Sequence, residues 1–583
     1  MPADRHVALA AELTCARIGA FARDLPGHAP LPGGVIVLAD RSATLGQVTF
    51  GHADLGRGEP MQADHLFQIG SISKVFTALL AGQLAAESRL SLDEPVSRFL
   101  PWLDLGVGAR PATLRSLLSH TAGLVIGSDA VPDDLAQIWR LRELAVDPGP
   151  AHFHYSNLGF QIAGLVLEAA AGEPLGQLVA DRLLAPMGMT SSAPAITFAD
   201  RPRFATGYIA ARQDRIWLPG DPLVPAPWFE LAAADGNIAA TGPDLARLAM
   251  LLLDHGRVGQ RQVVDESVVA TMTASLAPDA GTGPDLPGVP PLTATRYGLG
   301  IGVDTIDGNL CLTHGGGMVG YSTFLLADTS AGLGVVVLTN ADGGNAHAEL
   351  IARAAHTDLL ARLAGGPEPA LPSGDPVVRL REMAQASPLP LGRFVAPYLP
   401  GRPTRIAVLG GPGGTVVVSC REREGRLFRL LTGTYATDHP DLRSFALTPA
   451  VQAGQPLWTW GPVVYREDGG DGASQDPGGA ASQFAAERQV PELWTALEGH
   501  YRCYSPWYPE FRVFVRAGAL WLAAPGGVEA PGAEEPLIEV TPGVFRIGAE
   551  DWLPERLTAG PLVDGRVISV NRDGCEYSRS FTP

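Results

Sequence analysis

The order of two hydrophobic patterns along the first part of the chain constrains the fold most. Short apolar runs typical of β-strands occur near the start and return far downstream, and the stretch between them is mostly helical in pattern. Strand runs so far apart share one sheet if the helical stretch is an insertion. We therefore predict an α+β fold, with one antiparallel sheet flanked by helices and an inserted helical subdomain. The expected strands lie at 34–38, 47–50, 297–303, 310–313, 321–327 and 333–339, and helices at 5–24, 75–86 and 345–364.

A different pattern begins near residue 391, where short strand-like runs alternate with Gly and Pro turns. This pattern is typical of an all-β, barrel-like region. Two breaks rich in small and polar residues delimit it, and we interpret both as linkers. The sequence leaves open whether the two β segments form two small domains or one barrel. The predicted divisions are an α+β domain at 1–366, a linker at 367–390, β segments at 391–466 and 489–583, and a flexible linker at 467–488.

Length and composition narrow the class of protein. At 583 residues the chain is too long for one core. Its net charge of −18 disfavours nucleic acid and anionic membranes, whose phosphates it would repel. No apolar run reaches about 18 residues, so we expect no transmembrane helix. Charges interrupt the N-terminal stretch where an export signal would be apolar, and the five cysteines are scattered without a CxxC pair. We therefore expect a cytoplasmic protein, and nothing implies a metal or an organic cofactor.

Lys74 is the only lysine in the chain, since every other basic position among the 43 lysines and arginines is arginine. Lysine differs from arginine most in that it can lose its proton when it is buried. Ser71 lies three residues earlier and therefore on the same face of a helix. This pair fits a serine nucleophile that is activated by an amine. The alternative is an incidental surface lysine at the start of a helix.

Three short motifs follow one another in chain order: Ser71-Ile72-Ser73-Lys74, then Tyr155-Ser156-Asn157, then His314-Gly315-Gly316-Gly317. SxxK, YxN and a KTG-like triplet in this order resemble the penicillin-recognising serine hydrolases. The chain looks like the group of class C β-lactamases, D-alanyl-D-alanine carboxypeptidases, D-aminopeptidases and family VIII esterases. The resemblance extends over residues from about 10 to 363. No G-x-S-x-G sequence occurs, which excludes the serine elbow of α/β-hydrolases.

The resemblance implies catalytic roles for residues of each motif. Ser71 is the expected nucleophile, and either Lys74 or Tyr155 is the general base; the sequence leaves open which of the two acts first. The backbone N–H groups of Ser71 and Gly317 are expected to form the oxyanion hole. His120, which follows a predicted helix, is interpreted as a structural residue at the helix end.

Four further residues are expected to contact the substrate. Asn157 is expected to hold Lys74 in place and to donate to a substrate carbonyl, while Gly315 and Gly316 let a substrate lie along the strand next to His314. His314 departs from the β-lactamases of the group, which usually have lysine there and so offer a fixed positive charge to a carboxylate. Histidine at this place resembles certain carboxypeptidases, D-aminopeptidases and esterases. The sequence therefore disfavours β-lactamase activity.

We predict a serine hydrolase that forms an acyl-enzyme on Ser71. The first choice is a peptidase or aminopeptidase acting on small peptides or amides, including those with D-residues; a carboxylesterase of the family VIII type is the alternative. A β-lactamase, an acyltransferase and a non-catalytic binding protein on the same scaffold are further alternatives. The sequence leaves the oligomeric state open, a homo-oligomer included. We also predict that a loop of the barrel-like region, 431–435 or 504–508, enters the mouth of the active site.

Overall fold

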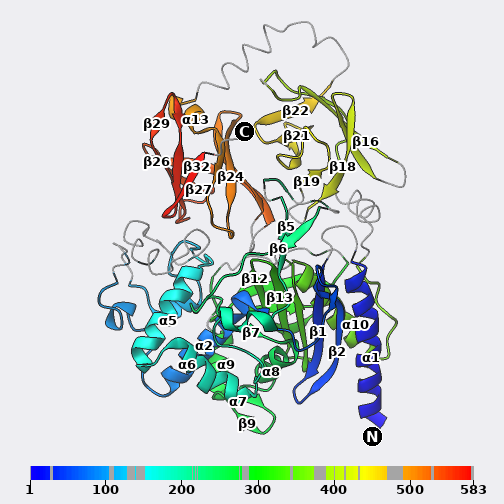
Figure 1. Ribbon diagram of the computed structural model, residues 1–583, viewed down its shortest axis with the longest axis vertical. Coiled ribbons are helices and arrows are strands. Elements are labelled where there is room, and N and C mark those ends of the chain that lie inside the picture. Colours follow the sequence, from blue (N-terminus) through cyan, green and yellow to red (C-terminus); the bar gives the residue numbers. More distant parts are fainter. Residues whose placement is uncertain are drawn as a thin grey trace. The chain divides into compact units, whose positions relative to one another are not determined.

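The computed structural model divides the chain into two compact units (Figure 1). The first unit consists of residues 1–25, 30–209 and 223–372, and the second consists of residues 26–29, 210–222 and 373–583. The structure describes residues 2–25, 31–103, 105, 111–127, 138, 152–212, 214–216, 218, 221–274, 276–278, 286, 288–341, 346–372, 389–399, 401–411, 415–430, 434–468, 490–526 and 531–579.

An eight-stranded antiparallel sheet forms the centre of the first unit. Its strand order is β10-β11-β12-β13-β14-β1-β2-β3, so β1 pairs with β14 although the two are far apart in the chain. Both strands are almost entirely buried, as expected for strands that are covered on both faces. The strands span Gly33–Asp40 (β1), Thr44–Asp54 (β2), Glu59–Pro60 (β3), Leu292–Tyr297 (β10), Gly302–Ile306 (β11), Asn309–Met318 (β12), Tyr321–Asp328 (β13) and Leu333–Thr339 (β14).

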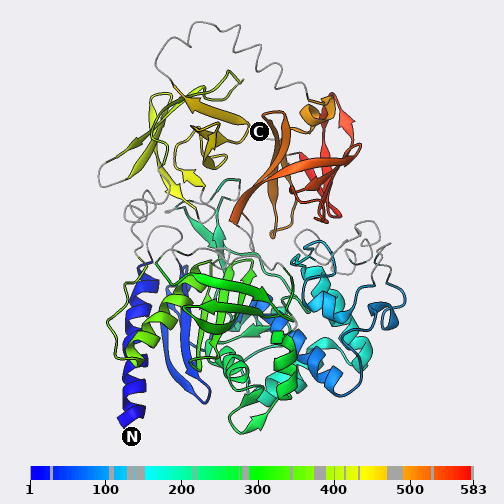
Figure 2. The same cartoon turned by 180° about the vertical axis from the view of Figure 1, so that it is seen from behind.

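Helices cover both faces of this sheet. On one face, α1 (Pro2–Arg23) and α10 (Ala346–Leu363) pack side by side and share a core with the sheet that includes Ile36 (Figure 1, Figure 2). On the other face, α8 (Gly242–Leu253) packs on β1, β13 and β14. A Cβ on Gly242 would lie 2.7 Å from Val35 Cγ1, so the glycine lets α8 approach β1 closely. Because side chains alternate along a strand, Ile36 and Val35 face opposite layers.

The chain between β3 and β10 is mainly helical. Within it, α2 (Ser73–Ala86) contacts both α5 (Asn157–Ala171) and α9 (Glu266–Ala274). The predicted helical insertion is therefore confirmed. The remaining elements of this stretch are α3 (Leu114–Leu118), α6 (Leu175–Val179), α7 (Ala185–Met187), the short helices η1 (Gly70–Ile72), η2 (Val96–Arg98), η3 (Ala180–Leu184) and η4 (Phe198–Arg203), and the strand pairs β4 (Phe67–Gln68) with β7 (Ala239–Ala240), β5 (Tyr208–Ala210) with β6 (Leu223–Pro225), and β8 (Arg257–Val258) with β9 (Arg261–Gln262).

The predicted α+β class, the N-terminal hairpin and the helices at 5–24 and 345–364 are confirmed. The predicted strand at 297–303 is wrong, because β10 ends at Tyr297 and β11 begins at Gly302. Gly300 has a φ of +68°, and its backbone N–H donates to Leu118 O at 2.9 Å. A Cβ on Gly298 would meet Met272 O at 2.1 Å. The two glycines thus bend the chain against the helices where the apolar pattern suggested a continuous strand.

The second unit contains two closed eight-stranded barrels, so the barrel-like region is not one barrel. The first barrel consists of β15 (Gly392–Val395), β16 (Arg405–Gly410), β17 (Val416–Cys420), β18 (Arg423–Arg429), β19 (Tyr435–Thr437), β20 (Leu447–Gln452), β21 (Gln455–Trp460) and β22 (Val463–Glu467). The second consists of β23 (Gly499–Arg502), β24 (Glu510–Arg516), β25 (Ala519–Gly526), β26 (Pro531–Thr541), β27 (Val544–Ile547), β28 (Arg556–Ala559), β31 (Ser569–Arg572) and β32 (Cys575–Arg579), accompanied by α13 (Glu492–Leu497) and the pair β29 (Leu562–Val563) and β30 (Arg566–Val567).

The two barrels share apolar contacts within this unit. The core of the first barrel, which contains Phe445 and Trp460, also takes in Phe514 from the second. The rings of Phe445 and Phe514 meet edge to face with centroids 5.3 Å apart. Residues 216 and 218, from the stretch 210–222 that interrupts the first unit, pack against Phe428 of the first barrel. The second unit is therefore held together by side chains from three separate parts of the chain.

No single helix in the described ranges is both long enough and apolar enough to cross a membrane. The pair formed by α5 and residues 175–187 passes the same test only when both are taken together, and it is bent by 80°.

Asp358 on α10 bonds to side chains of α1 and so links the two helices. Its buried carboxylate accepts from Thr14 Oγ1 at 2.8 Å and from Arg362 Nε at 2.7 Å, and it pairs with Arg17. Burial opposes ionisation, but these hydrogen bonds hold the pKa of Asp358 below its ordinary value. The ionised carboxylate thus stabilises the fold above the ordinary aspartate pKa, and this contribution disappears as the pH falls through the lowered value.

We expect Asp358→Asn to lower the free energy of unfolding by about 2–3 kcal/mol at neutral pH, because two partly buried arginines lose their charged partner in the core and keep only the exposed Glu368. Denaturant unfolding and amide exchange in α1 measure the effect, and the loss should shrink toward acidic pH. The control is Asp93→Asn, which breaks the exposed pair with Arg115 and should cost less than about 1 kcal/mol. Equal losses for the two variants would contradict the assignment.

Candidate active site

Ser71 and Lys74 lie at the junction of a short turn and a buried helix. Ser71 is the central residue of η1, and Lys74 is the second residue of α2. Lys74 is fully buried and Ser71 is 5% exposed. The sequence predicted a helix start at Ser71, and the α-helix begins two residues later, after the turn. The turn brings the side chains of Ser71 and Lys74 into contact.

The amine of Lys74 is held by three oxygen atoms. Lys74 Nζ lies 2.8 Å from Ser71 Oγ, 2.6 Å from Asn157 Oδ1 and 2.9 Å from the backbone oxygen of Asp235. The amide oxygen and the carbonyl oxygen only accept, so they can take both N–H groups of an uncharged amine. The third direction then points the nitrogen lone pair at the Ser71 hydroxyl. The geometry brings together a serine and an amine that can receive its proton.

The Tyr155-Ser156-Asn157 motif forms the start of α5. Ser156 is the N-cap, because its hydroxyl accepts from Gly159 N at 3.0 Å. Asn157, the first helical residue, therefore projects its side chain toward Lys74. The ring of Tyr155 lies beside the same amine, with its centroid 5.0 Å from Lys74 Nζ. The structure thus places Tyr155 and Asn157 next to Ser71 and Lys74, as the sequence predicted.

The glycines of the third motif let β12 touch the turn that carries Ser71. A Cβ on Gly316 would lie 2.0 Å from Ile69 O, and a Cβ on Gly70 would lie 2.9 Å from Gly317 N. No side chain fits at either place. β12 pairs with β13 from Cys311 to Met318, but its pairing with β11 ends at Thr313. Within the described residues, β12 therefore has a ladder partner on one side only from His314 onward, next to Ser71.

His314 is buried and uncharged. Its Nδ1 donates to Gly315 O at 2.7 Å, because a carbonyl oxygen can only accept, and its Nε2 accepts from the hydroxyl of Tyr297 at 2.8 Å. Burial, assisted by the nearby Lys74, lowers the pKa of His314 to about 3 against the opposing hydrogen bond to Gly315. Burial also raises the pKa of Tyr297 well above its ordinary value. At neutral pH this position offers no positive charge.

His120 is more than the helix-end residue that the sequence indicated. It does follow α3, with a φ of +57°, and its Nδ1 accepts from Ser156 N at 3.0 Å. Its ring also packs on Tyr155 and Tyr297, with centroids 4.2 and 4.9 Å away. Burial, with Lys74 nearby, lowers the pKa of His120 well below its ordinary value. An uncharged His120 thus links the second motif to the third through Tyr297, and sequence reasoning gave neither residue this role.

Two groups of side chains in the described residues, buried apart from the half-buried Asp441, have a composition that could bind a metal: Cys311, Asp328 and His356 in the first unit, and Cys420, His439 and Asp441 in the second. In the first group, Asp328 accepts from His356 Nε2 at 2.8 Å and from Asn309 Nδ2 at 2.7 Å. In the second, both ring nitrogens of His439 face backbone partners. Hydrogen bonds within the protein account for both groups, and neither includes a residue around Ser71.

Residues 19–433 match the protein family described as Beta-lactamase. The chain belongs to this family. It is accordingly a serine hydrolase, and its predicted place among the penicillin-recognising enzymes is confirmed. The match also extends past the predicted end of the resemblance near residue 363, into the first barrel.

Relatives of different activity share this match. A D-aminopeptidase from Cereibacter sphaeroides is 28% identical over 370 residues, which cover 59% of this chain and 62% of that protein. The esterase EstB from Burkholderia gladioli is 33% identical over 199 residues, which cover 30% and 50%. An octameric penicillin-binding protein homologue from Pyrococcus abyssi has a similar fold, with a TM-score of 0.53 at 20% identity over 78% of this chain and 98% of that one.

The hydrogen bond between Tyr297 and His314 can be tested by titration. Tyr297→Phe removes a donor that stabilises the neutral imidazole, so the pKa of His314 should rise above its value of about 3. NMR of the labelled histidine Cε1, assigned by comparison with His314→Gln, measures the shift. Tyr321→Phe is the control, since that hydroxyl donates to Ala205 O instead. A His314 signal that titrates identically in both variants would contradict the assignment.

Proposed function

We propose that Ser71 attacks an amide carbonyl and that the enzyme is a peptidase or aminopeptidase of small peptides. The contact of 2.8 Å between Lys74 Nζ and Ser71 Oγ carries the proposal, because Asn157 and Asp235 occupy the other directions around the amine. Lys74 takes the proton of Ser71 as the C–O bond forms. This arrangement fits Lys74 as the first base.

The developing oxyanion is stabilised by the backbone N–H groups of Ser71 and Gly317. The closeness of Gly317 N to Gly70, which precedes the serine, supports this role. The tetrahedral intermediate then collapses, the C–N bond breaks and the leaving amine takes a proton from Lys74 or from Tyr155. Water attacks the resulting ester of Ser71 by the same route and regenerates the free enzyme.

The substrate lies along the free side of β12 from His314 onward, where its backbone can extend the ladder. The uncharged His314 and Tyr297 bond to each other and offer no positive charge to a carboxylate. This argues against a β-lactam or a peptide whose terminal carboxylate is anchored at this position. An uncharged amide fits the site, and the longer match to the D-aminopeptidase than to the esterase supports an N-terminal D-residue.

The esterase remains the second candidate, because EstB has the higher identity over its shorter match. Esters and amides use the same acyl-enzyme, so the pocket around the acyl group decides between them. Entry of residues 431–435 or 504–508 into the active site stays a prediction; residues 431–433 lie outside the described part of the chain. A cytoplasmic location and a homo-oligomer also stay predictions.

Lys74→Arg should lower kcat/KM by about 10³-fold or more, since arginine keeps the charge but cannot receive the serine proton. Lys74→Met, which keeps the length without the amine, should lower it equally. Arg98→Met at an exposed position should have no effect. Steady-state kinetics measures the three variants, and an active Lys74→Arg enzyme would rule out Lys74 as the base.

The substrate class is tested with D-alanine p-nitroanilide, its L-isomer, a short-chain p-nitrophenyl ester and nitrocefin. We expect the wild type to cleave the D-anilide fastest and Ser71→Ala to cleave none of them. Cleavage of the ester alone, with Ser71 required, would replace the peptidase with the esterase. Equal activity of wild type and Ser71→Ala would overturn the catalytic assignment itself.

A further inference from the structure

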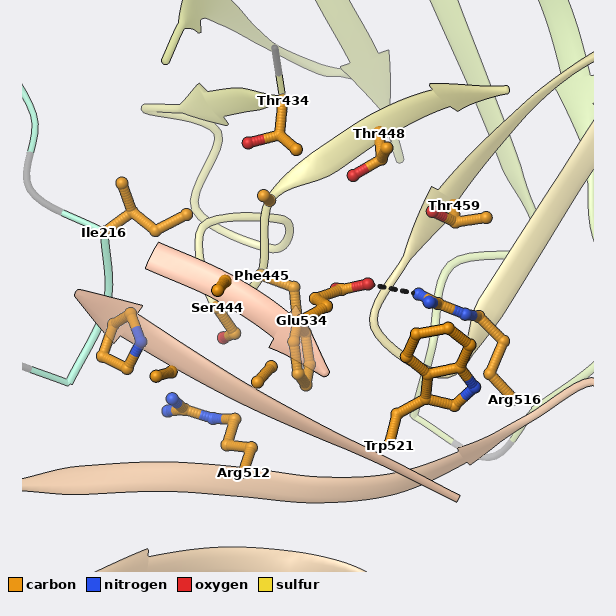
Figure 3. Close-up of a pocket in the computed structure, with 15 residues that line it drawn as sticks. Ile216, Thr434, Ser444, Phe445, Thr448, Thr459, Arg512, Arg516, Trp521 and Glu534 are labelled. Carbon is orange, nitrogen blue, oxygen red and sulfur yellow. Dashed lines mark hydrogen bonds and ion pairs between the residues drawn. The ribbon is translucent and has the colours of Figure 1, made fainter. Parts of the chain in front are cut away.

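The second unit contains a cavity of about 350 Å³ where its two barrels meet (Figure 3). The first barrel contributes Phe445 and Thr448, and the second contributes Arg512, Trp521 and Glu534. None of these residues belongs to the group around Ser71. The volume is within the range of small-molecule sites, and the combination of an apolar wall with a few charged groups is typical of such sites.

Arg512 stands at one end of the cavity with incomplete charge compensation. Among the residues that the structure describes, its recorded ion-pair partner is Glu510, at 4.0 Å, and that carboxylate also faces His500 at 3.2 Å and Arg502 at 3.1 Å. The Arg512 side chain is only 17% exposed. Burial lowers the pKa of Arg512, and the nearby carboxylates of Glu510 and Asp214 oppose this shift. A carboxylate in the cavity would add to the long contact of 4.0 Å that Glu510 provides.

Glu534 and Trp521 present polar atoms without partners on another side of the cavity. Glu534 Oε2 is fixed by Arg516 Nη1 at 2.6 Å, whereas the buried Oε1 has no hydrogen-bond partner in the described part of the chain. The indole Nε1 of Trp521 is buried and likewise unpartnered there. Arg516 lies over the Trp521 ring, with its Cζ 4.4 Å from the ring centroid, and so holds both side chains in place. Glu534 Oε1 is thus a buried acceptor, without a recorded donor among the described residues, on a side chain that lines the cavity.

Figure 3 shows Arg512 apart from the Arg516–Glu534 pair, with Thr448 and Thr459 facing them from the first barrel. A ligand that satisfies the cavity therefore needs an anion at one end and a hydrogen-bond-donating cation at the other. Among the lining residues, two arginines and one glutamate present charges of both signs, which suits a ligand that carries both an anion and a cation.

We propose that this cavity binds a small α-amino carboxylate, either a free amino acid or a short peptide. The ligand's carboxylate pairs with Arg512, and its ammonium group donates to Glu534 Oε1. The small side chain of the ligand packs against Phe445. This site is formed by the second unit alone, and its existence does not depend on the reaction catalysed at Ser71.

The test uses the full chain carrying Ser71→Ala, so that peptide probes are not consumed. Calorimetry measures the binding of L-alanine, D-alanine and L-alanyl-L-alanine, together with propionate and propylamine, which carry one charge each. We expect one zwitterion to bind per chain. Each single-charge probe should bind with an affinity lower by about tenfold or more. The relative affinities of alanine and dialanine distinguish a free amino acid from a peptide.

Arg512→Gln should weaken the binding of the zwitterions by about tenfold or more, while the matched control Arg423→Gln, at an exposed position of the first barrel, should leave it unchanged. Ala524→Leu, which fills the cavity without altering a charge, should abolish binding and serves if Arg512→Gln does not fold. Zwitterion binding that survives both variants would place the ligand elsewhere and overturn the proposal. The absence of binding by every probe, or propionate binding as tightly as alanine, would overturn it equally.

Discussion

The site depends on how one buried amine is surrounded. Taking Lys74 out of water is costly for a charged ammonium group, and Asn157 and Asp235 offer it oxygens that only accept. An uncharged amine removes the cost of burying a charge and keeps both hydrogen bonds. Its remaining direction faces Ser71. The same contacts that satisfy the buried nitrogen therefore prepare it to take a proton.

Three separate parts of the fold bring these residues together. The turn η1 carries Ser71, the capped start of α5 carries Asn157, and β12 presses its glycines against the turn. The distances are too short for a Cβ at Gly316, so the sheet and the turn fix each other's position. His120 and Tyr297 fill the space between the second and third motifs with uncharged rings. These packed rings place no further charge between the two motifs.

Much of this could be predicted from the sequence, for identifiable reasons. The unique lysine and the spacing of Ser71 and Lys74 are local signals, and the two sets of strand-like runs follow from side-chain alternation. The strand at 297–303 was mispredicted because apolar residues continue across Gly298 and Gly300, whose backbone contacts with distant helices leave no local pattern. The roles of His120 and Tyr297 arise only from contacts between residues far apart in the chain. The closure of two barrels likewise depends on long-range pairing.

The pairing of β1 with β14 has a consequence for how the protein is made. A ribosome releases β1 long before β14, and until Thr339 emerges the strand that begins at Gly33 lacks the neighbour on one of its edges. Contacts between such distant residues slow folding, and an unpaired apolar strand invites association with other chains. The serine turn also awaits Gly316, which is synthesised late. The nascent chain therefore passes through a long interval in which Ser71 has been made but the strand that packs beside it has not, and a chain broken off before β14 leaves β1 exposed and prone to aggregate.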